Sequence, residues 1–153
     1  MIECNHFVDN RHDIAGTGRA GTSYWARYNI SEAIDPPVSH AFDMHGNHES
    51  RRDGKEWPKF AGDSIVICYN TFKSRDPRDY ITIRGDPRMG VTVHHNVYER
   101  ARFGARSMEP CKSMTAYEDK FLAKPLYAYY RFDAAGNTVN GKRRPAGLVT
   151  EYP

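Results

Sequence analysis

The sequence predicts an all-β chain that coils into a parallel β-solenoid of about four turns. Four short segments resemble one another, and each places an asparagine after a short alternating run. Helix signals are also weak over residues 1–98, where glycine and proline interrupt the chain repeatedly. The four segments are "IECNHF" (2–7), "ARYNIS" (26–31), "ICYNTF" (67–72) and "VHHNVY" (93–98).

The recurring asparagines suit the bends of such a coil. Successive turns of a solenoid stack about 4.8 Å apart, so identical side chains lie above one another. Asparagine tolerates the left-handed backbone of a tight bend, and its amide can bond to the asparagine above and below. We therefore expect a structural ladder, not a catalytic set, from Asn5, Asn29, Asn70 and Asn96.

A second set of segments alternates with the first and ends each time in glycine: "HDIAG" (12–16), "AFDMHG" (41–46) and "YITIRG" (80–85). Because the two sets alternate, one repeat is expected to hold two strands and two bends. The longer middle interval predicts an insertion over 47–60, which is charged and contains Pro58, as a surface loop should.

Beyond residue 100 the pattern weakens. Residues 117–132 are aromatic and mixed, and residues 133–145 are basic and rich in turn formers. Asn137 continues the asparagine set as one degenerate turn. Because a solenoid needs its last turn covered, we expect residues 1–100 to form the parallel turns and residues 101–153 to form a C-terminal turn and capping segment of the same domain.

The composition suits one domain with a core and a mildly basic surface. The chain has 153 residues, with 22 basic and 19 acidic side chains and a net charge of +3. This balance could favour an acidic partner such as a polyuronate or a nucleic acid, and an ordinary mixed surface would carry the same charge. The three cysteines make no zinc-type pair.

The sequence predicts neither a membrane span nor a nucleotide site. It contains no sufficiently long apolar run, and no signal peptide opens it, so a mature enzyme and an excised fragment would look the same. The segment "GTGRAG" (16–21) matches the dinucleotide pattern, but an aromatic run follows it instead of a helix. Neither the cellular compartment nor the oligomeric state follows from these features.

Aligning the second set by its glycines brings distant apolar side chains together. Phe42 and Met44 align with Ile81 and Ile83, and Ile14 aligns with Met44. We expect these positions to face inward.

The residues between them are expected to point outward in two columns. Asp13, Asp43 and Thr82 form the first column, and Ala15, His45 and Arg84 form the second. Neighbours in a column lie about 5 Å apart, so Asp43, His45 and Arg84 should share one patch.

The first set of segments gives another column by the same logic. It consists of Glu3, Arg27, Cys68 and His94, with Trp25 beside it. This column mixes charges as ordinary surface does, and it could also touch substrate. The candidate substrate-binding residues are therefore Asp13, Trp25, Arg27 and His94. A calcium ion held by the outward carboxylates of Asp13 and Asp43 is the one cofactor considered, and no other metal site is expected.

A carboxylate, an imidazole and a guanidinium in one patch can do chemistry. Histidine exchanges a proton near neutral pH, and arginine binds and neutralises a carboxylate. Asp43 can orient His45 or raise its basicity. A surface salt-bridge cluster of small energetic weight would contain the same residues, and that interpretation stays open.

The repeated asparagine turns, with "SHAFDMHG", "AGDSIVICYNTF" and "GVTVHHNVY" between residues 39 and 98, resemble proteins of the pectin-lyase-like superfamily. The resemblance covers about residues 2–100. It implies a right-handed parallel β-helix (solenoid) of about four turns with an irregular C-terminal cap. The superfamily is mostly extracellular or periplasmic and hosts lyases, hydrolases, epimerases and uncharacterised proteins, so the fold alone does not imply a function.

A narrower resemblance concerns "HAFDMH", which is similar to the Tyr-Gly-Phe-Asp-Pro-His catalytic motif of alginate C5-epimerases. By that match Asp43 and His45 fall on the catalytic aspartate and histidine, and His40 falls on the catalytic tyrosine. Arg84 is placed as the arginine that the family also uses. Met44 replaces the proline of the motif, and the replacement of tyrosine by His40 puts the general acid in doubt.

The resemblance implies a uronan lyase or C5-epimerase that acts on an acidic polysaccharide. Arg84 would neutralise the uronate carboxylate, His45 would take the C5 proton, Asp43 would orient His45, and His40 would donate a proton from the other side. The alternative is a non-catalytic glycan-binding or structural β-helix module, including a fragment of a larger protein.

Overall fold

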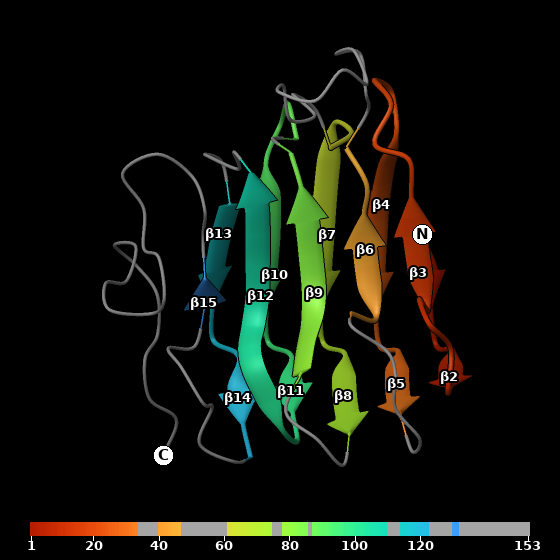
Figure 1. Cartoon of the computed structure of the whole chain (residues 1–153), viewed down its shortest axis with the longest axis vertical. Coiled ribbons are helices and arrows are strands. Elements are labelled where there is room, and N and C mark those ends of the chain that lie inside the picture. The colour runs from red at the N-terminus through yellow and green to blue at the C-terminus, as the bar shows by residue number, and fades with distance from the viewer. Residues whose placement is uncertain are drawn as a thin grey trace.

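The computed structural model describes residues 1–33, 40–46, 61–74, 78–85, 87–109, 114–122 and 130–131. Every regular element in these ranges is a β-strand, which confirms the all-β prediction. The strand pairs within them are parallel, and the strands form three five-stranded sheets (Figure 1). None of the described segments is a helix of the length and hydropathy needed to cross a membrane.

The three sheets share the strands in a fixed rotation. Sheet A contains β1 (Ile2–Glu3), β4 (Ser23–Arg27), β7 (Ser64–Cys68), β10 (Val91–His94) and β13 (Met114–Tyr117). Sheet B contains β2 (His6–Val8), β5 (Ile30–Ala33), β8 (Thr71–Ser74), β11 (Val97–Tyr98) and β14 (Lys120–Phe121). Sheet C contains β3 (Ile14–Gly16), β6 (Phe42–Met44), β9 (Arg78–Arg84), β12 (Ala101–Glu109) and β15 (Tyr130–Arg131). In Figure 1, sheet C faces the viewer, sheet A lies behind it, and sheet B lies below.

The repeat therefore holds three strands, where the alternating segments predicted two. The additional strand follows each asparagine directly, as β5 follows Asn29 and β8 follows Asn70. Only Tyr28 and Asn29 separate β4 from β5, so the strands on both sides of the predicted bend lie within one short segment of the sequence, "ARYNIS". Strands β12 to β15 extend the same sheets past residue 100.

Two of the predicted features lie outside the described residues. These are the insertion over 47–60 and the degenerate turn at Asn137.

The asparagine set forms the predicted ladder. Nδ2 of each asparagine donates to Oδ1 of the next, over 3.0 Å for the Asn5–Asn29, Asn29–Asn70 and Asn70–Asn96 steps. The same Oδ1 atoms accept the backbone N–H of the preceding asparagine over 3.0 to 3.1 Å. Asp119 continues the ladder, because its Oδ1 accepts both Nδ2 and the backbone N–H of Asn96, over 3.0 and 2.7 Å. Two hydrogen bonds therefore fix the register of each turn on the next.

The left-handed backbone belongs to the residue before each ladder position, and not to asparagine as predicted. The φ angles are 58°, 55°, 55°, 54° and 51° at Cys4, Tyr28, Tyr69, His95 and Glu118. The ladder hydrogen bonds hold the asparagine in place, so the preceding residue makes the turn.

Stacked side chains from all three sheets form one core. In sheet B the ring of Phe72 stacks on Tyr98, with centroids 5.1 Å apart and planes 6° apart, and Tyr98 stacks on Phe121 with centroids 4.9 Å apart. Phe42 of sheet C meets Phe72 edge-on, with centroids 5.0 Å apart. Sheets B and C are therefore joined through aromatic contacts, which favour such offset and edge-to-face geometries.

Replacing Asn70 by alanine should lower the free energy of unfolding by about 2–3 kcal/mol. Asn70 is 1% exposed, and its loss leaves the backbone N–H and side-chain amide of Asn29 without their acceptor. Urea unfolding followed by circular dichroism measures the change.

Asn10→Ala is the control for this measurement, because Asn10 is exposed and donates a single side-chain hydrogen bond to Asp13. We expect it to change the free energy of unfolding by less than about 0.5 kcal/mol. If Asn70→Ala costs no more than Asn10→Ala, the ladder does not stabilise the fold.

Candidate functional site

Strand β6 and its flanks carry the functional side chains proposed from the sequence. Strand β6 pairs with β9 in the predicted register, so that Phe42 lies beside Ile81. Phe42 and Met44 are 0% and 1% exposed, which confirms that they face the core. The next residue after β6 is His45, and the last residue of β9 is Arg84, so the two side chains leave neighbouring strands at the same level.

The register of β3 on β6 differs from the prediction by two residues. Ile14 pairs with Phe42, whereas alignment by the glycines placed it against Met44. Gly16 pairs with Met44 instead, and a Cβ at Gly16 would come 2.7 Å from the Met44 sulfur. Gly16 therefore allows close packing on Met44, and it is not the structural equivalent of Gly46.

Asp43 is fully buried, although the alternation predicted that it points to solvent. Its Oδ2 lies 3.0 Å from Nε2 of His40, 2.6 Å from Nε2 of His45 and 3.0 Å from Nη2 of Arg84. The exposed fractions of these side chains are 0% for Asp43, 8% for His40, 44% for His45 and 29% for Arg84. The partners of the carboxylate therefore cover it, and two of them reach the surface.

The surroundings of Asp43 keep it ionised. Burial by itself would raise the pKa of the Asp43 carboxyl. The hydrogen bond from His40 and the charges of His40, Arg84 and His45 outweigh burial, and the pKa lies below its ordinary value. The cluster therefore contains a buried negative charge.

Of Asp43 and its three partners, His45 has the largest exposed fraction. Burial lowers the pKa of its imidazole, Arg84, His12 and His40 lower it further, and the Asp43 charge opposes them. The net pKa lies below the ordinary value for histidine, which favours the neutral ring near pH 7. At 2.6 Å from a carboxylate oxygen, Nε2 must carry a proton, so the neutral ring has its lone pair on Nδ1.

His40 Nε2 lies between an acceptor and a donor. It is 3.0 Å from Asp43 Oδ2 and 2.8 Å from Arg84 Nη2. A proton on Nε2 can be donated to Asp43, whereas a lone pair on Nε2 can accept from Arg84. The tautomer of His40 therefore decides which of the two neighbours it bonds.

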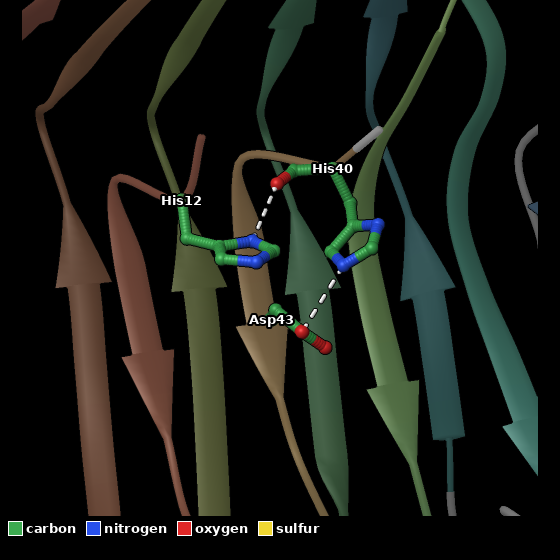
Figure 2. Close-up of side chains that lie close together, drawn as sticks. All are labelled: His12, His40 and Asp43. Carbon is green, nitrogen blue, oxygen red and sulfur yellow. Dashed lines mark hydrogen bonds and ion pairs between the residues drawn. The ribbon is translucent and has the colours of Figure 1, made fainter. Parts of the chain in front are cut away.

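His12 belongs to the same cluster, and the sequence analysis missed it. Its Nδ1 lies 3.1 Å from the carbonyl oxygen of His40, and the two rings have centroids 4.7 Å apart (Figure 2). The backbone N–H of Asp13 donates to Ala41 over 2.8 Å, which sets the chain around His12 beside the chain around His40. In both segments a histidine stands two residues before an apolar residue, as His12 before Ile14 and His40 before Phe42. Aligning the segments by these histidines, and not by their glycines, would have found the pair.

The described contacts of the four candidate substrate-binding residues are with residues other than Asp43. The Asp13 carboxylate accepts hydrogen bonds from Ser31 and Asn10, and its backbone N–H donates to Ala41, so Asp13 lies beside Ala41 and not beside Asp43. The structure therefore gives no support to a calcium ion held between Asp13 and Asp43. The remaining three belong to β4 and β10 of sheet A. Arg27 bonds Glu3 over 2.6 Å, His94 Nδ1 lies 2.8 Å from His95 Nδ1, and Trp25 is 48% exposed.

Three side chains of the cluster could hold a metal ion. His12, His40 and Asp43 each offer one ligand atom, and these atoms lie within 4.8 Å of one another. Two imidazoles and one carboxylate suit zinc and related transition metals better than calcium, which prefers six to eight oxygen ligands.

The end of β3 and the residues after it contact the backbone of His45. The backbone N–H of His45 donates to the carbonyl of Gly16 over 2.8 Å. Gly18 has a φ of +64°, and a Cβ there would come 2.2 Å from the His45 carbonyl oxygen. The glycine thus lets two backbone segments approach closely at the site.

Comparison of the chain with models of known protein families, with curated proteins and with solved structures finds no match.

Gly18→Ala should lower the melting temperature more than Gly21→Ala. Both positions have a positive φ, of +64° and +83°, so each alanine has the left-handed penalty of about 1–2 kcal/mol. Only the Gly18 substitution also drives a Cβ into the His45 carbonyl, because nothing lies within 4 Å of a Cβ at Gly21. Differential scanning calorimetry measures both variants, and equal losses would show that the approach to His45 is not tight.

Proposed function

We propose that the three sheets form a right-handed parallel β-helix. The strand order supports this, because the chain passes through sheets A, B and C in turn and each strand pairs with the one three positions earlier. Connections between parallel strands are right-handed in nearly all known proteins. Such a coil presents outward side chains on a rigid scaffold, which suits a site that must hold an extended polymer.

We further propose that the protein abstracts the C5 proton of a uronate unit in an acidic polysaccharide, as a uronan lyase or C5-epimerase. The observation that carries this proposal is that His45 and Arg84, which are 44% and 29% exposed, meet over the buried carboxylate of Asp43. A base and a cation that both reach solvent are what proton abstraction next to a carboxylate requires.

Each exposed group has one role in the proposed reaction. Arg84 binds the uronate carboxylate and stabilises the negative charge that develops on it when C5 loses its proton. Nδ1 of His45 takes that proton, since Nε2 already carries one toward Asp43. The Asp43 charge then stabilises the imidazolium that results.

The electron pair left at C5 has two fates. In a lyase it forms the C4=C5 double bond, the bond from C4 to O4 breaks, and the leaving oxygen takes a proton from water. In an epimerase C5 takes a proton from water on the opposite face, and the bond to O4 stays intact.

His40 is a positioning residue in this proposal, and not the proton donor that the resemblance implies. Only 8% of its side chain is exposed, so a sugar reaches His45 and Arg84 before it reaches His40. Its Nε2 lies within 3.0 Å of both Asp43 Oδ2 and Arg84 Nη2, and it acts by holding these two groups.

A second candidate is a non-catalytic module that binds glycans. The observation in its favour is a set of exposed aromatic rings away from Asp43: Trp25, Tyr28 and Tyr69 are 48%, 52% and 43% exposed. Tyr28 and Tyr69 stack with centroids 5.3 Å apart. Exposed apolar rings of this kind are common in binding surfaces.

His45→Ala should abolish turnover and leave binding intact. The protein is incubated with alginate, pectate and glycosaminoglycans, and ultraviolet absorbance reports new double bonds while proton NMR reports epimerised units. Loss of a general base is expected to slow the reaction by at least about 100-fold.

His6→Ala is the matched control, because His6 also contacts a carboxylate, Glu32, over 2.8 Å but is 53% exposed and belongs to sheet B. It should keep full activity. No turnover by the wild-type protein on any of these polymers would contradict the enzymatic proposal. Binding without turnover that Trp25→Ala removes would favour the second candidate.

A further inference from the structure

We propose that His12, His40 and Asp43 form a binding site for a divalent transition metal ion such as Zn²⁺. This inference does not depend on the proposed activity, although both involve His40 and Asp43. It rests on three observations: the convergence of the three side chains, the hydrogen bond that orients His12, and a buried carboxylate oxygen that has no hydrogen-bond partner among the described residues.

The three side chains converge from two adjacent coils. His12 precedes β3, His40 precedes β6, and Asp43 lies within β6. Strands β3 and β6 are paired in sheet C. Figure 2 shows the two imidazoles and the carboxylate facing a common space. One ligand atom of each lies within 4.8 Å of the others, a spread that a single ion can bridge with small side-chain movements.

The hydrogen bond made by Nδ1 of His12 leaves its Nε2 available to bind a metal ion. The carbonyl oxygen of His40 can only accept, so His12 Nδ1, 3.1 Å away, carries the proton of a neutral ring. The lone pair of that ring is then on Nε2. A ligating histidine almost always donates its other N–H in this way, commonly to a backbone carbonyl, which fixes both tautomer and ring orientation.

The carboxylate of Asp43 also lacks a partner that an ion would supply. Oδ2 has three neighbours, but Oδ1 is buried and accepts no hydrogen bond from any described residue. Asp43 is 0% exposed, so bulk water does not solvate this oxygen. A buried acceptor without a partner is rare in proteins and calls for an explanation such as an ion.

The chemistry of the three ligands selects the metal. Two imidazole nitrogens and one carboxylate favour zinc, iron, cobalt or nickel over calcium or magnesium. Three protein ligands also leave a coordination position open, as in zinc sites that bind a water or a substrate group.

Arg84 sets the affinity of this site. Its guanidinium lies 3.0 Å from the Asp43 carboxylate and 2.8 Å from His40 Nε2, so an ion and Arg84 compete for the same two groups. Arg84 is 29% exposed and can turn toward solvent when an ion enters. Occupancy by an ion would also withhold His40 and Asp43 from the proposed proton transfer, so loaded and metal-free protein would differ in chemistry.

The test is titration of zinc chloride into the metal-free full-length chain, followed by calorimetry in the absence of any polysaccharide. We expect one equivalent to bind, at least about tenfold more weakly in His12→Ala, and severalfold more tightly in Arg84→Gln because the competing cation is gone. A loss of folding would weaken binding in both variants, so opposite changes identify the site.

His95→Ala is the control for adventitious binding, because His94 and His95 form a second histidine pair with their Nδ1 atoms 2.8 Å apart. It should bind zinc as the wild type does. Addition of cobalt chloride to the wild type should in turn give visible absorption bands of a bound, low-coordinate ion. Absence of a stoichiometric site, or a His12→Ala variant that folds and binds zinc as tightly as the wild type, would overturn the proposal.

Discussion

The side-chain amide ladder holds each three-strand repeat of the chain in register with the next, and the rest of the structure depends on that register. The bonded asparagines are 24, 41 and 26 residues apart, yet every Nδ2–Oδ1 distance is 3.0 Å. The distance between successive ladder positions is therefore independent of how many residues separate them in the sequence. Strands far apart in the sequence are thereby held side by side, and Asp43 and Arg84 meet although 41 positions separate them.

Fixed register lets the outer face of sheet C hold a charge that would otherwise be costly. A buried carboxylate is tolerated in proteins only when paired and hydrogen-bonded. Asp43 meets this condition through His40 and His45, which flank β6, and through Arg84 at the end of β9. Because these groups lie outside the apolar core, the cluster adds little to packing, and clusters of this kind are frequent at functional sites.

One cluster can support two different chemistries because its members are shared. The proton abstraction proposed above would use the exposed side chains of His45 and Arg84, with the buried carboxylate of Asp43 behind them. The proposed metal site adds His12, whose ring centroid lies 4.7 Å from that of His40 and 6.3 Å from that of His45. Asp43 is common to both, and the position of Arg84 decides which of them has access to its charge.

The sequence by itself determined the all-β class, the asparagine ladder, the inward positions of Phe42 and Met44, and the meeting of Asp43, His45 and Arg84. A repeated asparagine and alternating apolar residues suffice for this, since stacking converts a repeat in sequence into contact in space. Only the tertiary structure decided between the registers of β3 that the glycines and the histidines offered, and only it showed the burial of Asp43 and the third strand in each repeat. The physical reason is that a slip of two residues keeps every side chain on its own face of the sheet, so alternation cannot detect it. Contacts between neighbouring strands and their flanks decide it instead, as where Gly16 packs on Met44 and Gly18 on the backbone of His45.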